Sequence, residues 1–449
     1  MNGDSQTKPL EERVRSYGLP GLIRLDAPPS DPGQVDYLDL LPRSKRERAE
    51  LSAVAEHQGS ALLYLLDAEA GLESDDETLR KLSNSLANRS EPAWLGVIRP
   101  GSLEIYPVGF AKNWTSQPVE VIKSRSEAAP TLFQSLVHGT FHKDRAPRGA
   151  DYVFQRIYDN LTETARAFVS EDDKGPLDAL EVLSMTGRAL FFRFLLDRRI
   201  VRDPEREEIC PSADSLHEAF STPGAAAETS AWLDDTFNGD FLPLGEKTSV
   251  RDVAKPDLER RYRTYFDGVK DRAGMGFFNH LYAILRGWSA AGGSVQPELD
   301  WGELNFAHIP VGVLSQVYES FSHLVDRQAA RNTSVHYTPR LIAELMVDEA
   351  FAPLEDPAHA RILDPSCGAG IFLVLAFQRL FQARWEHDEE RPRTKAIQDI
   401  LYQQISGFDV SEPALRLAAL ALYITAIELN ASPRPPKDLK FPRNLRSEV

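Results

Sequence analysis

The chain has 449 residues, of which 42% are hydrophobic and 26% are charged, a balance typical of globular protein. At roughly 100–200 residues per domain, this length predicts two to four domains. Its only cysteines are Cys210 and Cys367, which excludes a disulfide scaffold or a zinc ribbon and fits a reducing compartment. We find no secretory signal and no apolar run of the roughly 18 residues that a membrane span needs, so we expect a cytoplasmic location.

The net charge of −16 is not that of a typical nucleic-acid-binding protein, but its distribution is uneven. Residues 331–449 contain 14 Lys+Arg and 16 Asp+Glu, so they carry only −2, and the remaining −14 lies upstream. Binding to DNA would therefore need local basic patches. Residues 143–148, Lys-Asp-Arg-Ala-Pro-Arg, are one candidate, although such a stretch is more often a solvated loop.

Residues 1–150 mix strand and helix patterns and are expected to form a small α/β domain of unknown role. The apolar run 60–66 has the length of a strand or of a buried helix. The β-rich runs 94–99 and 102–108 flank Pro-Gly and predict a hairpin. A metal-dependent nuclease needs Glu-x-Lys on a strand, whereas Glu120 and Lys123 would face opposite sides. We therefore predict no nuclease site and no metal site here.

Residues 151–330 are expected to form a helical domain. Apolar residues recur at helical spacing from residues 152–158 onward, and again over 182–201 and 277–288. The middle stretch predicts one apolar face, made of Leu183, Leu190, Phe191, Phe194 and Leu195. Such stripes are typical of the core of a helix bundle.

Residues 331–432 change to alternating strands and helices. Strands are predicted at 361–363 and 405–410, and helices at 371–385 and 412–429, with a charged loop over 387–395 before another helical stretch. Ser411 is suited to cap the last helix, whose first turn holds Pro413. This order predicts a parallel, doubly wound sheet.

The loop after the first of these strands is the candidate ligand site, because open parallel sheets bind ligands beyond the carboxyl ends of their strands. Asp364 ends the first strand and could accept a hydrogen bond from a ligand amine or anchor the loop through backbone amides. Asp409 ends the second and could accept both hydroxyls of a ribose. Gly368 and Gly370 would let the backbone turn tightly and approach a ligand closely. The pattern predicts a nucleoside-bearing cofactor.

A nicotinamide cofactor is the first alternative, because its sites also follow a strand with Gly-x-Gly-x-x-Gly. Leu373 occupies the third glycine position here, which weakens that interpretation. No phosphate-binding Gly-x4-Gly-Lys-Ser/Thr loop is found either.

Three motifs together resemble those of a known family. Residues 364–372, Asp-Pro-Ser-Cys-Gly-Ala-Gly-Ile-Phe, resemble the S-adenosylmethionine motif of N6-adenine DNA methyltransferases. Residues 334–339, Ser-Val-His-Tyr-Thr-Pro, resemble the motif before the first helix of that domain, and residues 407–415, Gly-Phe-Asp-Val-Ser-Glu-Pro-Ala-Leu, resemble its second-strand motif. The order of the three motifs and the spacing between them also match those of the family. Further landmarks at 190–200, 237–243 and 314–321 extend the resemblance to long type IIG-like restriction–modification and phage-defence methyltransferases.

The resemblance implies a fold and a function. The fold class would be α/β: a mixed N-terminal domain, a helical middle domain and, over 331–449, the first part of a Rossmann-like methyltransferase domain. The activity would be methyl transfer from S-adenosyl-L-methionine to N6 of adenine in double-stranded DNA.

The same resemblance assigns the cofactor-binding residues. Thr338 and Pro339 would line the methionine end of the cofactor, Asp364 would face its amino group and Asp409 would hold its ribose. The other residues that the motifs carry over are Tyr337, Pro365, Ser366, Gly368, Gly370 and Phe372. The alternative roles are capping of a helix for Tyr337 and packing in the core for Phe372. Cys367 is expected to be a small buried filler and not a nucleophile.

The family's Asn/Asp-Pro-Pro-aromatic motif, which accepts hydrogen bonds from the adenine amine and stacks on the flipped base, is not found. Residues 432–437, Ser-Pro-Arg-Pro-Pro-Lys, lack both the amide and the aromatic ring. We therefore predict no catalytic residue in this chain, a sheet with an unpaired edge, and inactivity of the chain alone.

The missing motif leaves three interpretations. The first is a methyltransferase portion whose partner, a polypeptide or segment, supplies the rest of the methyltransferase and the target-recognition domain. The second is a non-catalytic DNA-binding or assembly subunit of a restriction or defence complex. The third is a methyltransferase acting on RNA or protein.

Overall fold

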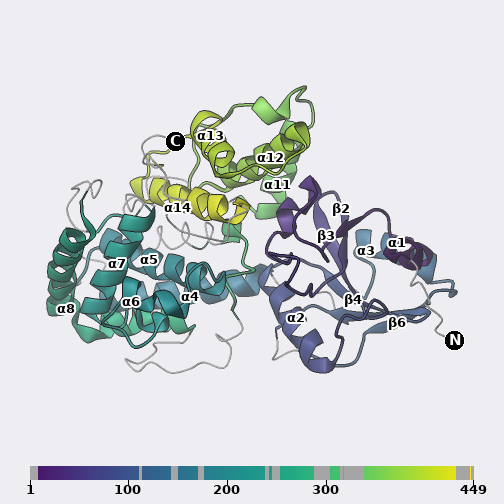
Figure 1. Cartoon of the computed structure of the whole chain (residues 1–449), viewed down its shortest axis with the longest axis horizontal. Helices are drawn as coiled ribbons and strands as arrows, with labels where there is room; N and C mark the ends of the chain where they lie inside the picture. Colours follow the sequence, from purple (N-terminus) through teal and green to yellow (C-terminus); the bar gives the residue numbers. More distant parts are fainter. Residues whose placement is uncertain are drawn as a thin grey trace. The chain divides into compact units, whose positions relative to one another are not determined.

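The computed structural model describes residues 9–110, 114–142, 150–169, 176–237, 242–244, 253–287, 304–313, 317, 338–430 and 445. The chain divides into two units, residues 1–153 and residues 154–449. Both helices and sheet are present, so the protein is of mixed α/β class (Figure 1). Among the described residues, no helix combines the length and the apolar character needed to cross a membrane.

The first unit is built on a six-stranded sheet whose strands lie in sequence order. All neighbours are antiparallel except β3 and β4, which are parallel because helix α2 (Asp76–Asn88) returns the chain between them. The strands are β1 Leu22–Arg24, β2 Ala53–His57, β3 Ser60–Asp67, β4 Trp94–Arg99, β5 Ser102–Pro107 and β6 Glu120–Lys123.

The predicted hairpin is confirmed. Strands β4 and β5 pair in antiparallel register up to Arg99 and Ser102, and Gly101 between them has φ of +73°, the left-handed region that glycine adopts without strain. The apolar run at 60–66 is a strand, β3. Strands β1 and β2 were not predicted.

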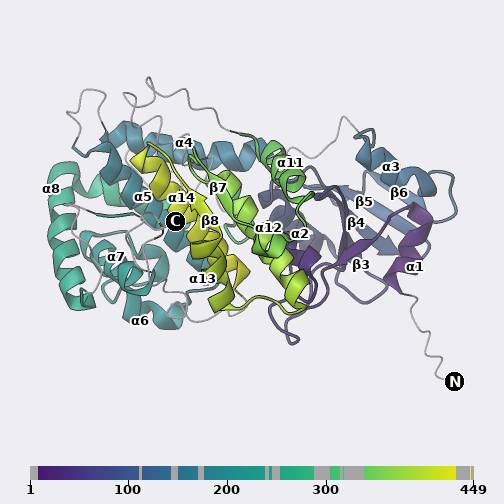
Figure 2. The same ribbon diagram turned by 90° about the horizontal axis from the view of Figure 1, so that it is seen from above.

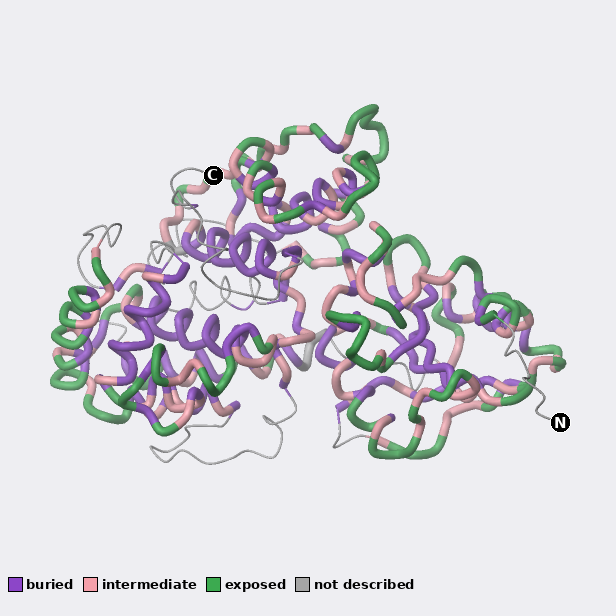
Figure 3. Tube along the Cα trace, in the orientation of Figure 1, coloured by how far each residue is buried: buried purple, intermediate pink, exposed green. Residues whose placement is uncertain are grey.

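The core of the first unit lies between the sheet and two short helices, α1 (Leu10–Val14) and α3 (Leu132–Val137). Leu63 and Leu65 of β3 point into this core from alternate positions of one strand face, and Trp94 of β4 joins them. Figure 3 shows the strands of this unit as mainly buried. Further members of the same cluster are Leu10, Val14, Leu103, Ile105, Phe133 and Leu136.

The second unit begins with a group of helices. They are α4 (Ala150–Phe168, which starts in the first unit), α5 (Ala179–Asp197), α6 (Arg206–Ile209), α7 (Pro223–Phe237) and α8 (Lys255–Arg286). The helices predicted at 152, 182 and 277 are thus confirmed as α4, α5 and the second half of α8. Helix α8 is bent at Gly274, whose φ of +70° and ψ of −175° are not helical.

Residues near each end of helix α5 determine where the helix begins and ends. Asp178 accepts a hydrogen bond from the Glu181 amide at 2.8 Å, and the Glu181 side chain accepts one from the Asp178 amide at 3.2 Å, which is a capping box. The helix ends at Asp197, earlier than the predicted residue 201, because Arg199 has left-handed backbone with φ of +54°.

The remainder of the second unit contains a two-stranded parallel sheet. Strand β7 (Ile362–Asp364) pairs with β8 (Ile405–Gly407), with Ile362 opposite Ile405 and Asp364 opposite Gly407. The accompanying helices are α11 (Arg340–Phe351), α12 (Ile371–Asp388), α13 (Thr394–Gln403) and α14 (Glu412–Leu429). The predicted strands and helices are confirmed, but β8 is shorter than predicted and the charged loop is limited to residues 389–393.

Helix α14 joins this part to the preceding helices. The Tyr423 ring meets Phe191 of α5 and Phe237 of α7 edge to face, at centroid distances of 6.4 and 5.8 Å. Glu428 forms an ion pair with Arg198 at the end of α5. Figures 1 and 2 both show α14 alongside α5. Helix α14 therefore packs directly on α5 and α7.

Candidate functional site

The parallel pairing of β7 and β8 brings the loops that follow them into contact. The Phe408 amide donates to the Asp364 carbonyl oxygen at 2.9 Å, and the Cys367 amide donates to the Phe408 carbonyl oxygen at 2.9 Å. The Gly370 amide then closes the turn by donating to the Cys367 carbonyl oxygen at 2.8 Å. We call residues 364–370 the glycine loop. It is tied by backbone hydrogen bonds to the end of β8.

Asp409 connects the glycine loop to the start of α14. Its Oδ2 accepts a hydrogen bond from the Gly368 amide at 2.9 Å, and its Oδ1 accepts one from the Ser411 amide at 2.7 Å. Ser411 in turn caps α14, because its Oγ accepts from the Ala414 amide at 3.4 Å. A carboxylate offers about four acceptor positions, so Asp409 retains capacity for further donors.

Asp364 lies at the carboxyl end of β7 with its two oxygens in different surroundings. Oδ1 accepts a hydrogen bond from the Ser366 amide at 3.0 Å. Oδ2 is buried and has no hydrogen-bond partner among the described residues. Burial raises the pKa of this carboxyl, and the negative charge of Asp409 raises it further. One oxygen therefore anchors the loop, while the other is buried without a donor among the described residues.

Close packing leaves little room for a side chain at two glycines around the loop. Gly370 has φ of +87°, and a Cβ there would lie 3.0 Å from the Ala418 Cβ and 3.1 Å from its Cα. A Cβ on Gly407 would lie 2.6 Å from Leu373 Cδ1. The sequence analysis identified Gly370, but it did not assign a role to Gly407, where the space for a side chain is limited by a helix distant in sequence.

Residues 338 and 339 lead into α11, which packs against α12, the helix that follows the glycine loop. Pro339 precedes α11, and its carbonyl oxygen accepts hydrogen bonds from the Ile342 and Ala343 amides at 2.9 and 3.0 Å. Thr338 is half-buried next to it, and Tyr337 lies outside the described residues. Phe372, on α12, packs against the small apolar cluster between α11 and α12.

The last third of the chain matches a known family. Residues 311–436 match the model of the N-6 DNA Methylase family. This part of the chain is therefore similar to the N-6 DNA methylases. We refer to residues 311–436 as the methylase segment.

Part of the chain is also similar in sequence to a curated methylase subunit. The chain is 26% identical over 145 residues to the methylase subunit of the type I restriction enzyme EcoEI from Escherichia coli. This match covers 32% of the chain and 26% of the relative, so the chain spans about a quarter of that protein's length.

Two solved structures align with most of the chain at low similarity. The DrdV–DNA complex, determined by cryo-electron microscopy, gives a TM-score of 0.35 with 13% identity over 94% of this chain and 35% of its own. The type IIG restriction endonuclease BpuSI gives 0.28 with 10% identity over 94% and 40%.

Two apolar side chains at the end of β8 in the methylase segment were not assigned from sequence. Val410 is 94% exposed and directly follows Asp409, and Phe408 directly precedes it and is 64% exposed. Both side chains therefore flank the Asp409 carboxylate at the surface. Only the folded structure distinguishes them from core residues, because the sequence pattern around them is that of a buried strand.

Cys367 is a packing residue of the methylase segment. It is buried against Gly407, since a Cβ on that glycine would lie 3.1 Å from the Cys367 Sγ. Burial raises the pKa of the Cys367 thiol to about 12 and that of Cys210 to about 11. The thiolate is the reactive form, so neither residue is set up as a nucleophile.

We expect iodoacetamide to leave both cysteines unmodified in the native chain at pH 8, because the thiols stay protonated and covered. Mass spectrometry of intact protein, with the same reaction in 8 M urea as the positive control, checks this. Alkylation of Cys367 in the native chain at the rate seen in urea would contradict its assignment as a packing residue.

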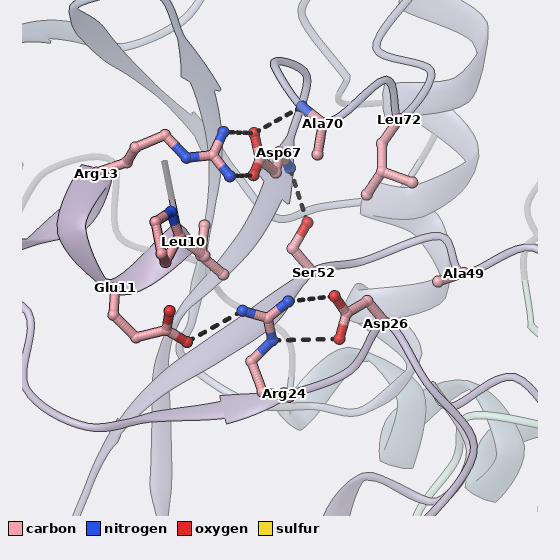
Figure 4. A pocket seen from close by; sticks show the side chains of 11 residues that line it. Leu10, Glu11, Arg13, Arg24, Asp26, Ala49, Ser52, Asp67, Ala70 and Leu72 are labelled. Atoms are coloured by element: carbon pink, nitrogen blue, oxygen red, sulfur yellow. Dashed lines mark hydrogen bonds and ion pairs between the residues drawn. The ribbon is translucent and has the colours of Figure 1, made fainter. Parts of the chain in front are cut away.

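The first unit contains a pocket of about 440 Å³ near the ends of β1 and β3 (Figure 4). Arg13 pairs there with Asp67, and Arg24 pairs with Asp26 and with Glu11. The charged side chains that line the pocket are thus engaged with one another. The pocket therefore gives no indication of a binding role.

Glu120 and Lys123, which were considered from the sequence as part of a nuclease site, lie apart on strand β6. Glu120 and Lys123 lie at the two ends of β6, and Glu120 pairs with His142 at 2.7 Å. Across the described ranges, no group of three or more His, Cys, Asp or Glu side chains is arranged to hold a metal ion. The basic stretch 143–148 and residues 432–437 lie outside the described residues.

Proposed function

We propose that the methylase segment binds S-adenosyl-L-methionine and supplies the cofactor-binding part of a Rossmann-like DNA methyltransferase in the cytoplasm. Its product would be N6-methyladenine in double-stranded DNA, in restriction–modification or phage defence. The observation that carries the proposal is the Asp364 Oδ2, which is buried without a partner where two parallel strands end. When bound, the cofactor would supply an electrophilic methyl group on a sulfonium centre.

The residues around the glycine loop fit such a ligand. The Asp364 carboxylate would accept a hydrogen bond from the ammonium group of the methionine part, and a cation there would offset the burial that raises its pKa. Asp409 would accept from the ribose hydroxyls with its remaining lone pairs. Val410, exposed next to it, would offer an apolar surface to the nucleobase.

The rest of the loop would shape the site. Gly368 and Gly370 have φ of +52° and +87°, which turn the backbone without side chains that would obstruct a ligand. Pro365 and Ser366 are exposed at the tip of the same loop. Thr338 and Pro339 would line the methionine end of the ligand, as their motif implies, with Tyr337 beside them in the chain, and Phe372 would hold the start of α12 against α11.

The family match makes DNA adenine the favoured substrate. The segment matches N-6 DNA methylases, and the curated relative is a methylase subunit of a restriction enzyme. The chain has no Asn/Asp-Pro-Pro-aromatic sequence to bind the adenine amine, so we propose that a partner polypeptide or segment supplies it. Radiolabelled methyl transfer to DNA by the purified chain alone is therefore expected to be absent.

Calorimetry with S-adenosyl-L-methionine tests the proposal directly, and Asp364→Asn is the informative variant. Asparagine keeps an acceptor for the Ser366 amide but removes the charge that would meet the ammonium group. We expect its affinity for the cofactor to be roughly tenfold lower at pH 8, the loss of one charge-assisted hydrogen bond. Asp356→Asn, which changes an exposed carboxylate paired with His359, is the control.

The pH dependence gives a second readout. Because the pKa of Asp364 is raised in the folded chain, its carboxyl disfavours folding once the pH rises through that pKa. At pH 8, the Asp364→Asn protein should therefore melt at the same temperature as the wild type or at a higher one. At acid pH, any such difference in melting temperature should disappear. The wild-type affinity should fall as pH drops through the same pKa, whereas that of the variant should not. Equal affinity of both proteins at pH 8 would overturn the role of Asp364.

A further inference from the structure

Residues 304–313 lead from the helices of the second unit into the methylase segment, and most of them lie outside helices and strands. We call them the strap. Irregular segments usually run over the surface, because their backbone groups need partners that water supplies there. The strap is instead largely buried, through the side chains of Leu304, Phe306, Ile309, Val311 and Val313. Its two ends have specific contacts that hold it in place.

Arg193 of α5 holds the first end of the strap. Its guanidinium donates hydrogen bonds to the carbonyl oxygen of Leu285, near the end of α8, and to that of Leu304, at 3.2 Å in the second case. Its Nε donates to Asp197 Oδ2 at 2.7 Å, and the same oxygen accepts from the Phe306 amide at 2.9 Å. The planar guanidinium thus joins α5, α8 and the strap with three nitrogens in fixed geometry.

Gly312 places the other end of the strap against the starts of α11 and α12. A Cβ added to Gly312 would lie 2.7 Å from Ile371 Cδ1 and 3.8 Å from Arg340 Cδ. Ile371 is the first residue of α12 and directly follows Gly370 of the glycine loop. Arg340 is the first residue of α11 and directly follows Pro339. The strap therefore contacts the chain immediately after the glycine loop and immediately after the Tyr-Thr-Pro motif.

Ile371 is packed closely enough to pass a movement of the strap to the glycine loop. It is 8% exposed and belongs to the apolar cluster that contains Ala343 and Val347 of α11. The residue before it, Gly370, lies against Ala418 of α14. Close-packed interiors transmit strain, because they have little free volume to absorb a displacement. A shift of the strap would therefore shift the start of α12 and the loop that precedes it.

We propose that the strap positions the glycine loop for its ligand, with Arg193 as the positioning residue at one end and Gly312 at the other. The helices of the second unit would then set the geometry of the cofactor site without touching the cofactor. This inference rests on the proposed function, because the ligand that it invokes is S-adenosyl-L-methionine. Binding groups must be held within about 0.5 Å of their productive positions, so a small displacement of the loop should lower the affinity.

The inference also gives a role to the polar residues of the stretch 190–200. Arg193 and Asp197 are one helical turn apart on α5 and form an ion pair, and Arg193 is only 9% exposed. Packing alone does not require this pair, because apolar side chains of similar volume commonly stabilise a protein as well as a buried ion pair does. Their hydrogen bonds to the strap supply the reason that packing does not.

Arg193→Lys tests the first end of the strap, since lysine keeps the charge but not the planar fork that joins two carbonyl oxygens. Arg188→Lys is the matched control. Arg188 is also buried on α5, and its guanidinium donates to the carbonyl oxygens of Leu242 and Ser230, which lie outside the strap. We expect both variants to melt at a lower temperature, but only Arg193→Lys to bind S-adenosyl-L-methionine more weakly, by roughly tenfold in calorimetry.

Gly312→Val tests the second end, where the backbone is not left-handed and only packing opposes a side chain. The affinity for S-adenosyl-L-methionine should fall by roughly tenfold. Ile371→Ala removes as many side-chain carbons as the valine adds, so combining the two changes should restore part of the affinity. Gly268→Val on α8, where an added Cβ meets nothing within 4 Å, should bind as the wild type does. No recovery in the combined variant would overturn the role of Gly312.

Hydrogen exchange in the free chain gives a readout that needs no ligand. Three amides of the glycine loop donate hydrogen bonds, so they should exchange faster in Arg193→Lys and Gly312→Val than in the two control variants. Unchanged exchange in the loop, or equal losses of affinity in Arg193→Lys and Arg188→Lys, would overturn the inference. A wild-type chain that does not bind S-adenosyl-L-methionine would overturn the proposed function, and the exchange rates would still decide whether the strap positions the loop.

Discussion

Replacing Gly370 by valine is expected to lower the free energy of unfolding by about 3 kcal/mol and to abolish cofactor binding. Two costs add at this position. The backbone is left-handed, with φ of +87°, which a β-branched residue tolerates poorly. The new Cβ would also lie 3.1 Å from the Ala418 Cα, so α12 and α14 would have to separate to admit the side chain.

Urea unfolding followed by circular dichroism measures the loss, with Gly71→Val as the matched control. Gly71 has nearly the same φ, +86°, but an added Cβ there would meet nothing within 4 Å. Gly71→Val should therefore lose only the unfolding free energy that a side chain in left-handed backbone costs, about 1–2 kcal/mol. If Gly370→Val and Gly71→Val lose the same stability, the close packing of the glycine loop on α14 is wrong.

Replacing Asp409 by alanine should reduce the affinity for S-adenosyl-L-methionine by about 100-fold, through the loss of two charge-assisted hydrogen bonds to the ribose. The same change removes the acceptor of the Gly368 and Ser411 amides, so we also expect a loss of about 2 kcal/mol in stability. Calorimetry and urea unfolding measure the two effects separately.

Asp409→Asn distinguishes the ligand role from the structural role. Asparagine retains one oxygen acceptor, so it should recover part of the stability, while its amide would offer donors where the ribose hydroxyls need acceptors. An Asp409→Asn protein that binds the cofactor as wild type does would show that Asp409 only connects the loop to α14.

The sequence determined those features of the protein that depend on neighbouring residues. The hairpin at Pro100-Gly101, the capped start of α14 and the periodicity of α5 follow from turn chemistry, capping and helical spacing, which act over a few residues. The order of the motifs around residues 364–372 and 407–415 identified the family, and the match over residues 311–436 agrees. The ends of helices were predicted less accurately than their presence. Helix α5 ends just before Arg199, whose left-handed backbone stops the helix although the apolar pattern continues.

The tertiary structure alone decided what each residue of the site contacts. Sequence predicted that Asp364 would either anchor the loop or face a ligand, and the fold shows one oxygen engaged and the other buried without a partner. The space for a side chain at Gly407 is limited by Leu373, and the space at Gly370 is limited by Ala418. The exposure of Leu363 depends on which sheet face the helices cover. These are contacts between segments distant in sequence, and local propensity carries no information about them, because packing and burial arise only when the segments meet.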